Sequence, residues 1–314
     1  MSSGRFGIRQ PPQPGLPHEP ELDPPFDVIE PETLTSPLVF SSPHSGCVYP
    51  RRFLASARLD AMTLRRSEDA YVDELFAGVV AGGAPLVRAR FPRAYLDLNR
   101  EAYELDPRMF EGRLPSFANT RSVRVAGGLG TIARVVGDSQ EIYAQRLKVD
   151  EALARIEKLY KPYHRSLQDL LGRARQSFGL AVLIDCHSMP SISTLPLPES
   201  ADRKIKADFV LGDRYGTSAA IEFVDCVEHE LQRLGYTVLR NKPYAGGFIT
   251  EHYGDPPSHF HAMQIEVNRA LYMDEKSMAK AERFGRITAD LAEVVATLAQ
   301  RIAARYGGTR AAAE

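Results

Sequence analysis

Short apolar runs alternate along this chain with longer segments of helical period. The run 181–184 is apolar, branched and uninterrupted, which is typical of a strand buried on both faces. Further strands are expected within 36–46, 84–100, 236–247 and 262–273. Helices are expected over 67–83, 140–179 (as two helices bent at Pro162), 218–235 and 277–308. The alternation predicts an α/β fold, a single domain with a mixed, mostly parallel central sheet flanked by helices.

The two ends of the chain differ from the rest in composition. Residues 1–25 are rich in proline, which cannot donate regular backbone hydrogen bonds, so we expect an extended N-terminal arm there. The segment 26–308 is expected to form one folded domain, because it contains neither an internal repeat nor a clear interdomain linker.

Composition excludes several classes of protein. The chain has 39 Lys and Arg against 40 Asp and Glu, a balance that argues against a nucleic-acid partner. No apolar stretch approaches the roughly 18 residues of a membrane span, and the first residues lack the apolar segment of a secretory signal. The three cysteines are Cys47, Cys186 and Cys226, too few for a disulfide framework. A reducing, cytoplasmic setting is therefore expected, with the oligomeric state left open.

Four polar clusters follow predicted strands: SSPHSG, DLNR, DCHSMP and QIEVNR. In an open α/β sheet the functional crevice lies beyond the carboxyl ends of the strands, so these clusters are the candidate site. Neutral imidazole is a common zinc ligand, which makes His44 and His187 the first candidates. A third ligand is expected from Glu68 or Asp69, at the start of the helix that follows SSPHSG. Alternatively, each histidine only caps a helix or satisfies a loop carbonyl group.

Charged residues in the other clusters suggest further roles. Glu266 interrupts an apolar strand, where a carboxylate is costly unless it is paired or functional, and it is a candidate general base. Alternatively, Glu266 only forms a salt bridge with Arg269. Arg100 is able to hold a substrate carboxylate in a bidentate fork, or else to pair with Glu101 or Glu104. Arg214, in the GDRYG loop, is a further substrate-binding candidate.

A nucleophilic thiol or hydroxyl is the competing chemistry. Cys186 and His187 are adjacent in extended chain, so their side chains point apart, and Cys186 is expected to be a small core residue. Cys47 and Ser188 remain as nucleophiles of a metal-free hydrolase. The glycine-rich stretch around Gly127 does not match the spacing of a dinucleotide-binding loop, so we expect no nucleotide site.

Nine motifs occur in one order between Leu38 and Glu275: SPHSG, SEDAYVDELF, RAYLDLNR, IYAQRL, KPYH, DCHSMP, LGDRYG, NKPYAGGFIT and QIEVNR. Together they resemble the N-formylglutamate amidohydrolase family, a distant relative of the zinc carboxypeptidases and of aspartoacylase. The resemblance implies a zinc-carboxypeptidase-like (phosphorylase/hydrolase-like) fold and one zinc ion per chain.

The resemblance also implies roles for individual residues. His44, Asp69 and His187 would be the zinc ligands. Glu68 stays an alternative to Asp69, because Ala70 follows Asp69 where the family often has an aromatic residue. Carboxypeptidases place their carboxylate ligand three residues after the first histidine, a position that Cys47 occupies here.

In the same comparison Glu266 would be the general base, and Asn99 with Arg100 would bind a substrate carboxylate. The implied reaction is zinc-dependent hydrolysis of N-formyl-L-glutamate, or of a close N-acyl amino acid, to formate and the free amino acid, a closing step of histidine breakdown. A metal-free cysteine or serine amidase, and a non-catalytic binding module on the same fold, are the alternatives.

Overall fold

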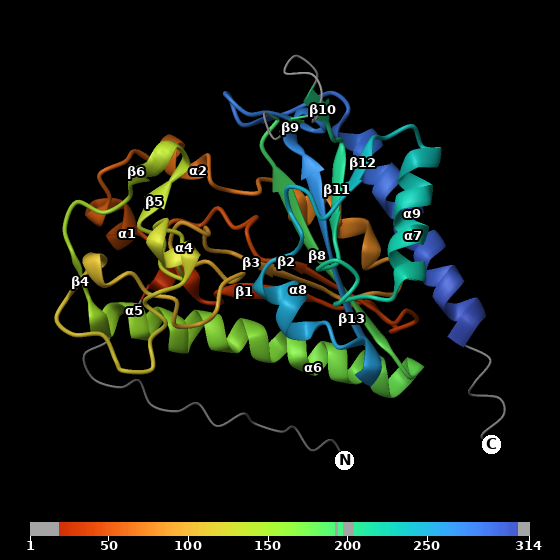
Figure 1. Cartoon of the computed structure of the whole chain (residues 1–314), viewed down its shortest axis with the longest axis horizontal. Helices are drawn as coiled ribbons and strands as arrows, with labels where there is room; N and C mark the ends of the chain where they lie inside the picture. Colours follow the sequence, from red (N-terminus) through yellow and green to blue (C-terminus); the bar gives the residue numbers. More distant parts are fainter. Residues whose placement is uncertain (1–18, 192–193, 197–203, 307–314) are drawn as a thin grey trace.

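The computed structural model describes residues 19–191, 194–196 and 204–306. At its centre is a seven-stranded sheet in the order β1-β3-β2-β8-β13-β11-β12 (Figure 1). These strands are β1 Phe26–Ile29, β2 Leu38–Ser42, β3 Leu86–Ala89, β8 Ala181–Met189, β11 Phe209–Gly212, β12 Val238–Arg240 and β13 Phe260–Asn268. Only β1 with β3 and β11 with β13 pair antiparallel, so the predicted mixed, mostly parallel sheet is confirmed.

The remaining elements are helices and short strand pairs. The α-helices are α1 Arg51–Ser56, α2 Ala61–Arg65, α3 Val72–Leu75, α4 Val123–Ala126, α5 Val149–Arg155, α6 Lys161–Phe178, α7 Ile221–Arg233, α8 Phe248–Tyr253 and α9 Phe284–Tyr306. The 3₁₀ turns are η1 Pro20–Leu22, η2 Ala77–Val79, η3 Pro107–Met109, η4 Gly137–Ser139, η6 Pro256–Ser258 and η7 Arg269–Leu271, and η5 Ile156–Tyr160 is a π-helical turn. The two-stranded sheets use β4 Phe110–Glu111, β5 Val135–Val136, β6 Gln140–Glu141, β7 Leu147–Lys148, β9 Thr194–Pro196, β10 Lys204–Lys206, β14 Met273–Asp274 and β15 Ala279–Lys280.

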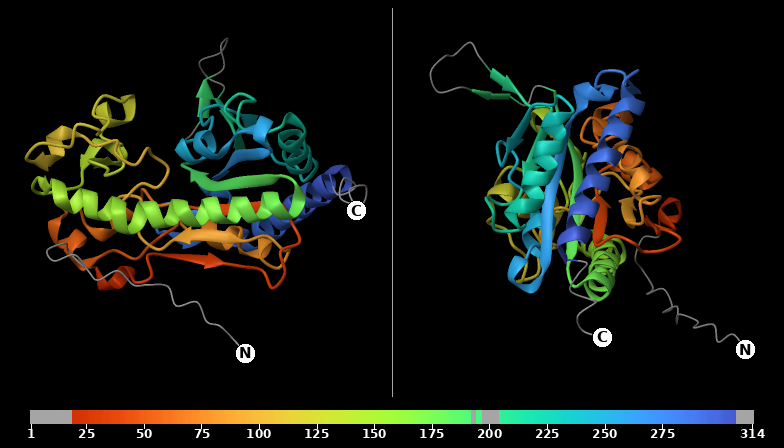
Figure 2. Two further views of the ribbon diagram at one scale, coloured as in Figure 1. Left: turned by 90° about the horizontal axis from the view of Figure 1, so that it is seen from below. Right: turned by 90° about the vertical axis from the view of Figure 1, so that its right-hand side faces the viewer.

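Helices cover both faces of the central sheet (Figure 2). Alternate residues of β8 point to opposite faces, so Val182 and Ile184 pack with α3, α7 and α9, whereas Ala181 and Leu183 pack against α6. This two-sided burial explains why the strand is apolar at successive positions.

The segment between β3 and α5 contributes no strand to the central sheet. It contains α4 and the short strands β4 to β7, which lie beside the sheet in Figure 1. This lateral part forms the second wall of the cavity described below.

The helix expected over 67–83 is wrong in its extent. The segment forms only α3 and η2, and both begin after Asp69. Tyr71 adopts a left-handed conformation with φ of 65°, which prevents a helix from running through it. The backbone N–H of Asp69 donates instead to the carbonyl oxygen of His44 at 3.0 Å, so this turn is fixed by a contact with another loop.

The two helices expected over 140–179 start later than predicted, and Pro162 does not interrupt them. Helical structure runs from Val149 to Phe178 without a gap. The first part of the expected helical segment, before Val149, contains β6 and β7 instead. The π-helical turn η5 directly precedes α6, in which Pro162 is near the N-terminus. A π-helical turn shifts the hydrogen-bond register by one residue, and this widening accommodates the proline in a continuous helix.

The remaining predictions concern the end of β8, the two ends of the chain and membrane-spanning segments. Strand β8 continues to Met189, so His187 lies within a strand and not in a loop after it. Residues 1–18 of the expected arm and residues 307–308 of the expected domain lie outside the described residues, so the division at residue 25 stays a prediction. Among the described helices, none is long and apolar enough to cross a membrane.

Candidate functional site

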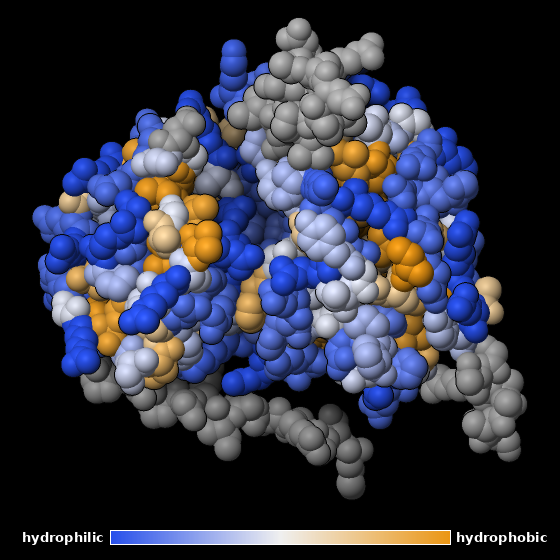
Figure 3. Space-filling view, in the orientation of Figure 1, coloured by the Kyte–Doolittle hydropathy of each residue, from blue (hydrophilic) through white to orange (hydrophobic). Residues whose placement is uncertain are grey.

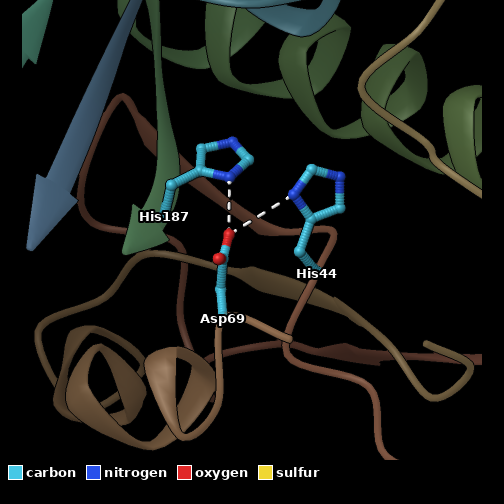
Figure 4. A group of neighbouring side chains, drawn as sticks. All are labelled: His44, Asp69 and His187. Carbon is cyan, nitrogen blue, oxygen red and sulfur yellow. Dashed lines mark hydrogen bonds and ion pairs between the residues drawn. The ribbon is translucent and has the colours of Figure 1, made fainter. Parts of the chain in front are cut away.

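Three buried side chains from different parts of the fold meet at one point (Figure 4). Asp69 Oδ2 lies 3.3 Å from His44 Nδ1 and 3.0 Å from His187 Nδ1. His44 belongs to the loop after β2, Asp69 to the turn before α3, and His187 to β8. One ligand atom from each residue falls within 4.8 Å of the others, so the group is able to hold a metal ion.

The outer nitrogen of each imidazole is bound by a second carboxylate. His44 Nε2 lies 2.7 Å from Asp97 Oδ1, and His187 Nε2 lies 2.7 Å from Asp185 Oδ2. A carboxylate accepts hydrogen bonds, so each Nε2 carries the proton and each Nδ1 is left with a lone pair. Metal-binding histidines are typically oriented by such carboxylates, which also raise the basicity of the ligand nitrogen.

The centre of this group suits a cation. His44 Nδ1 is buried and has no hydrogen-bond partner among the described residues. Two nitrogen lone pairs and a carboxylate oxygen facing one another repel, unless a proton or a cation lies between them. In the metal-free chain a proton takes that place on His187: burial opposes its charge, but Asp185 and Asp69 raise its pKa well above the ordinary value.

Asp69 is held in place by groups behind it. Arg269 Nη2 donates to Asp69 Oδ1 at 3.1 Å, while Oδ2 faces the two histidines. Burial opposes ionisation of this carboxyl, but the hydrogen bond from His187, the neighbouring His44 ring and the charge of Arg93 outweigh it and hold its pKa well below the usual range. Asp69 is therefore ionised, with one oxygen fixed and the other available to a cation.

Glu266 lies opposite His187 in the register of the parallel strands β13 and β8. Its side chain is 7% exposed, and burial together with the charge of Asp69 raises its pKa to about 7. Gln264 Nε2 donates to Glu266 Oε1 at 2.7 Å. Arg269 makes its carboxylate bond to Asp69, and no ion pair between Arg269 and Glu266 is present in the described part of the chain.

A cavity of about 730 Å³ opens above these residues. Figure 3 shows a recessed, largely hydrophilic area near the middle of the molecule. Its lining includes His44, Asp69, His187 and Glu266. Five arginines and three carboxylates line the cavity, so a bound metal ion would add to an existing excess of positive charge. The arginines are Arg66, Arg93, Arg100, Arg124 and Arg269.

The substrate-binding residues expected from the sequence differ in their positions. Asn99 and Arg100 line the cavity. Arg100 Nε donates to the carbonyl oxygen of Leu129 at 2.8 Å, and its Nη2 lies 3.5 Å from Asp97 rather than beside Glu101 or Glu104. Arg214 pairs with Glu251 at 2.9 Å and is not among the residues that line this cavity.

The alternative ligand and nucleophiles also have definite positions. Glu68 accepts a hydrogen bond from Tyr49 at 2.7 Å and is not part of the histidine group. Cys47 is exposed and does not line the cavity, and partial burial with the nearby charge of Glu68 raises the pKa of its thiol. Cys186 is fully buried, as expected of a core residue. Ser188 contacts Asp69 and Arg269, and no hydrogen bond from it to a histidine is present in the part of the chain that the structure describes.

Sequence reasoning missed four residues that support this site: Asp97, Asp185, Gln264 and Arg93. A usable signal existed for two of them. Asp185 and Gln264 precede His187 and Glu266 by two positions in a strand, a spacing that places side chains on the same face. Arg93 and Asp97 form an ion pair in the turns after β3, where side chains follow no regular helix or strand spacing that would predict the contact.

Comparisons with known proteins agree with this picture. The family model of N-formylglutamate amidohydrolase matches residues 36–273. An N-formylglutamate deformylase of Pseudomonas aeruginosa is 30% identical over 77% of this chain and 84% of its own, and that of Pseudomonas putida is 29% identical over 76% and 82%.

Solved structures add the fold. A crystal structure of an N-formylglutamate amidohydrolase from Ralstonia eutropha JMP134 superposes with a TM-score of 0.82 at 38% identity, over 88% of this chain and 98% of that one. A protein of Agrobacterium tumefaciens at 18% identity shares the fold, with a TM-score of 0.60 over 90% of this chain and 95% of that one. The chain belongs to the N-formylglutamate amidohydrolase family, a family of hydrolases that act on an amide bond, as its motifs indicated.

Proposed function

We propose that this protein hydrolyses the amide bond of N-formyl-L-glutamate, or of a close N-acyl amino acid, in a zinc-dependent reaction. The observation that carries the proposal is the His44, Asp69 and His187 group, with a buried carboxylate opposite it and an arginine-rich cavity above it. The named relatives act on N-formylglutamate, which gives the substrate class.

Zinc suits the donor atoms. Two imidazole nitrogens and one carboxylate oxygen are the three protein ligands typical of a catalytic zinc site, which keeps its fourth position open. We therefore propose one zinc ion per chain, bound by His44 and His187 through Nδ1 and by Asp69 through Oδ2. Zinc in such a site lowers the pKa of a water molecule and polarises a carbonyl group.

Glu266 is proposed as the proton carrier of the reaction. Its carboxylate takes a proton from the attacking water and then delivers that proton to the leaving amine nitrogen as the C–N bond breaks. A pKa near 7 suits both transfers, because a group that titrates close to the working pH gains and loses a proton readily. Formate and L-glutamate would be the products.

The arginines are proposed to select the substrate. N-formyl-L-glutamate carries two carboxylates, and the five arginines of the cavity outnumber its three acidic residues. Arg100 and Arg93 are candidates near the metal-binding group, because both contact Asp97, the partner of His44. Asn99 also lines the cavity and stays a substrate-binding candidate, although its Nδ2 is directed to Asp185 and lies 3.2 Å from His187 Nε2. Arg214 is not among the residues that line the cavity, so its role in substrate binding stays a prediction from the sequence.

The alternatives have less support. A metal-free mechanism lacks an activated nucleophile, since Cys47 is outside the cavity lining and Ser188 has a carboxylate and an arginine as partners. A binding module has no need for a buried carboxyl with a raised pKa opposite a metal-binding group. The pathway and the cytoplasmic location remain predictions.

The test is formate release from N-formyl-L-glutamate by protein treated with a chelator and then reloaded. We expect activity to disappear with the chelator and to return with zinc. N-formyl-L-glutamine, which lacks the side-chain charge, is expected to be a poorer substrate. Activity that persists in metal-free protein would contradict the zinc dependence, and equal turnover of both compounds would contradict selection by the arginines.

A further inference from the structure

The segment 246–249, which is the end of the loop after β12 and the first two residues of α8, contacts two polar side chains of the site through its backbone. Gly247 N–H donates to Gln264 Oε1 at 2.9 Å, and Ile249 N–H donates to Asn99 Oδ1 at 2.8 Å. Gln264 and Asn99 are each 4% exposed, so these amides have little access to water. The segment 246–249 therefore fixes the orientation of both side-chain amides, with the oxygen of each as an acceptor toward this segment and the nitrogen as a donor on the other side.

Through Gln264, the segment 246–249 is connected to the proposed base, Glu266. Because Oε1 of Gln264 accepts from Gly247, its Nε2 faces Glu266 and donates to Oε1 of that carboxylate at 2.7 Å. One oxygen of Glu266 is thus occupied, and Oε2 is left to carry the proton. Free rotation of the carboxylate is also prevented.

The contact with Asn99 leads to the proposed metal ligand. Because Oδ1 of Asn99 accepts from Ile249, its Nδ2 is directed to Asp185 Oδ2 at 3.2 Å. The same Asp185 oxygen binds His187 Nε2 at 2.7 Å. The segment 246–249 is therefore linked to His187 through the side chains of Asn99 and Asp185.

Gly247 provides the space that this arrangement needs. A Cβ atom at position 247 would lie 2.3 Å from Asn99 Nδ2 and 2.4 Å from Asn99 Oδ1. No real Cβ makes contacts this short, so any other residue at 247 would displace the amide of Asn99. The requirement is for space alone, because the backbone of Gly247 has an ordinary φ of −90°.

We propose that the segment 246–249, where the loop after β12 enters α8, is a positioning element that holds both the base and the metal ligand of this site, through Gln264 and Asn99. The inference rests on the proposed function, because it assigns these two amides to Glu266 and to His187. It adds two positioning residues and explains the glycine at 247.

Zinc affinity tests the link to His187. Loss of a group that orients a metal ligand typically weakens metal binding about 10- to 100-fold. We expect that loss for Asn99→Ala and for Gly247→Ala, measured on metal-free protein by competition for Zn²⁺ with a chromophoric chelator. In the double variant the shortened side chain at position 99 leaves room for the new Cβ, so Gly247→Ala should cause no further loss in the Asn99→Ala background.

Kinetics tests the link to Glu266. Gln264→Leu removes the donor to Glu266 and leaves the Asn99 contacts in place. We expect kcat to fall at least tenfold, with KM and zinc affinity nearly unchanged. A rise in KM at constant kcat would show that Gln264 binds substrate, and would refute the positioning role.

Gly254→Ala is the matched control. A Cβ there would lie 2.4 Å from Ser218 Cβ, a comparable clash at residues that do not line the cavity. It is expected to lower the melting temperature without changing zinc affinity. Wild-type zinc affinity in Gly247→Ala, or losses that multiply in the double variant, would overturn the inference alone. A wild-type protein without zinc affinity would overturn the proposed function and the inference together.

Discussion

Replacing Glu266 by glutamine separates a catalytic carboxylate from a structural one. Glutamine keeps the volume of the side chain, and its amide oxygen is able to accept the hydrogen bond from Gln264, but it cannot carry the proton. General-base catalysis typically contributes about 10²- to 10⁴-fold. We therefore expect kcat to fall by that range, about 3 to 5 kcal/mol of transition-state stabilisation, with KM nearly unchanged.

The same substitution has a defined effect on stability. Burial raises the pKa of Glu266 from 4.5 to about 7, so the folded chain binds the proton more tightly than the unfolded chain. Stability is therefore lost as pH rises through this window, and above pH 7 the buried charge costs on the order of 3 kcal/mol. Glutamine removes this cost, so the metal-free variant should melt no lower than wild type at pH 8 and higher if the full cost applies.

Both quantities are measured on one sample, by formate release and by thermal unfolding of metal-free protein. A structural carboxylate paired with Arg269 would give the opposite result, a less stable protein with normal turnover. The structure assigns Arg269 to Asp69 instead, at 3.1 Å. A Glu266→Gln variant that melts early and retains its kcat would refute the reasoning.

Three further predictions concern the surroundings of the site. Asp97→Asn should weaken zinc binding about 10- to 100-fold in the chelator competition, because a neutral amide orients His44 less well; unchanged affinity would remove Asp97 from the site. Arg100→Lys should raise KM for N-formyl-L-glutamate about tenfold or more, since lysine loses the planar fork; a lower melting temperature at unchanged KM would show a purely structural role through the bond to Leu129. Burial lowers the pKa of His164 from 6.5 to about 4, so the folded state binds fewer protons than the unfolded state and stability is lost as pH falls from 6.5 to 4. Urea unfolding across that range should show a loss of about 3 kcal/mol in wild type beyond that in His164→Gln, and parallel curves would contradict it.

The sequence predicted the fold because its signals are local. The apolar run 181–184 is buried on both faces by helices whose periods are also visible in the chain. The positions of single turns were harder to predict, since Asp69 depends on a left-handed Tyr71 and on a backbone bond to His44, and neither leaves a periodic pattern.

The candidate site was predictable only where a polar residue stands out against an apolar run. His44, His187 and Glu266 follow or interrupt apolar runs, and all three line the cavity. Asp97, which orients His44, comes from another loop, whereas Asp185 and Gln264 lie in the same strands as His187 and Glu266. The roles of all three depend on three-dimensional contacts. Arg100 shows the same limit, because much of its guanidinium is directed to backbone oxygens of Leu129 and Asn99.

The central claim is that His44, Asp69 and His187 together hold one zinc ion on which the hydrolysis depends. Titration of metal-free protein with Zn²⁺, followed at each addition by metal content and by formate release, measures this directly. We expect both to rise together and to saturate at one equivalent per chain, and His187→Ala to lose both. Saturation of activity with no zinc bound, or full activity in His187→Ala, would contradict the account.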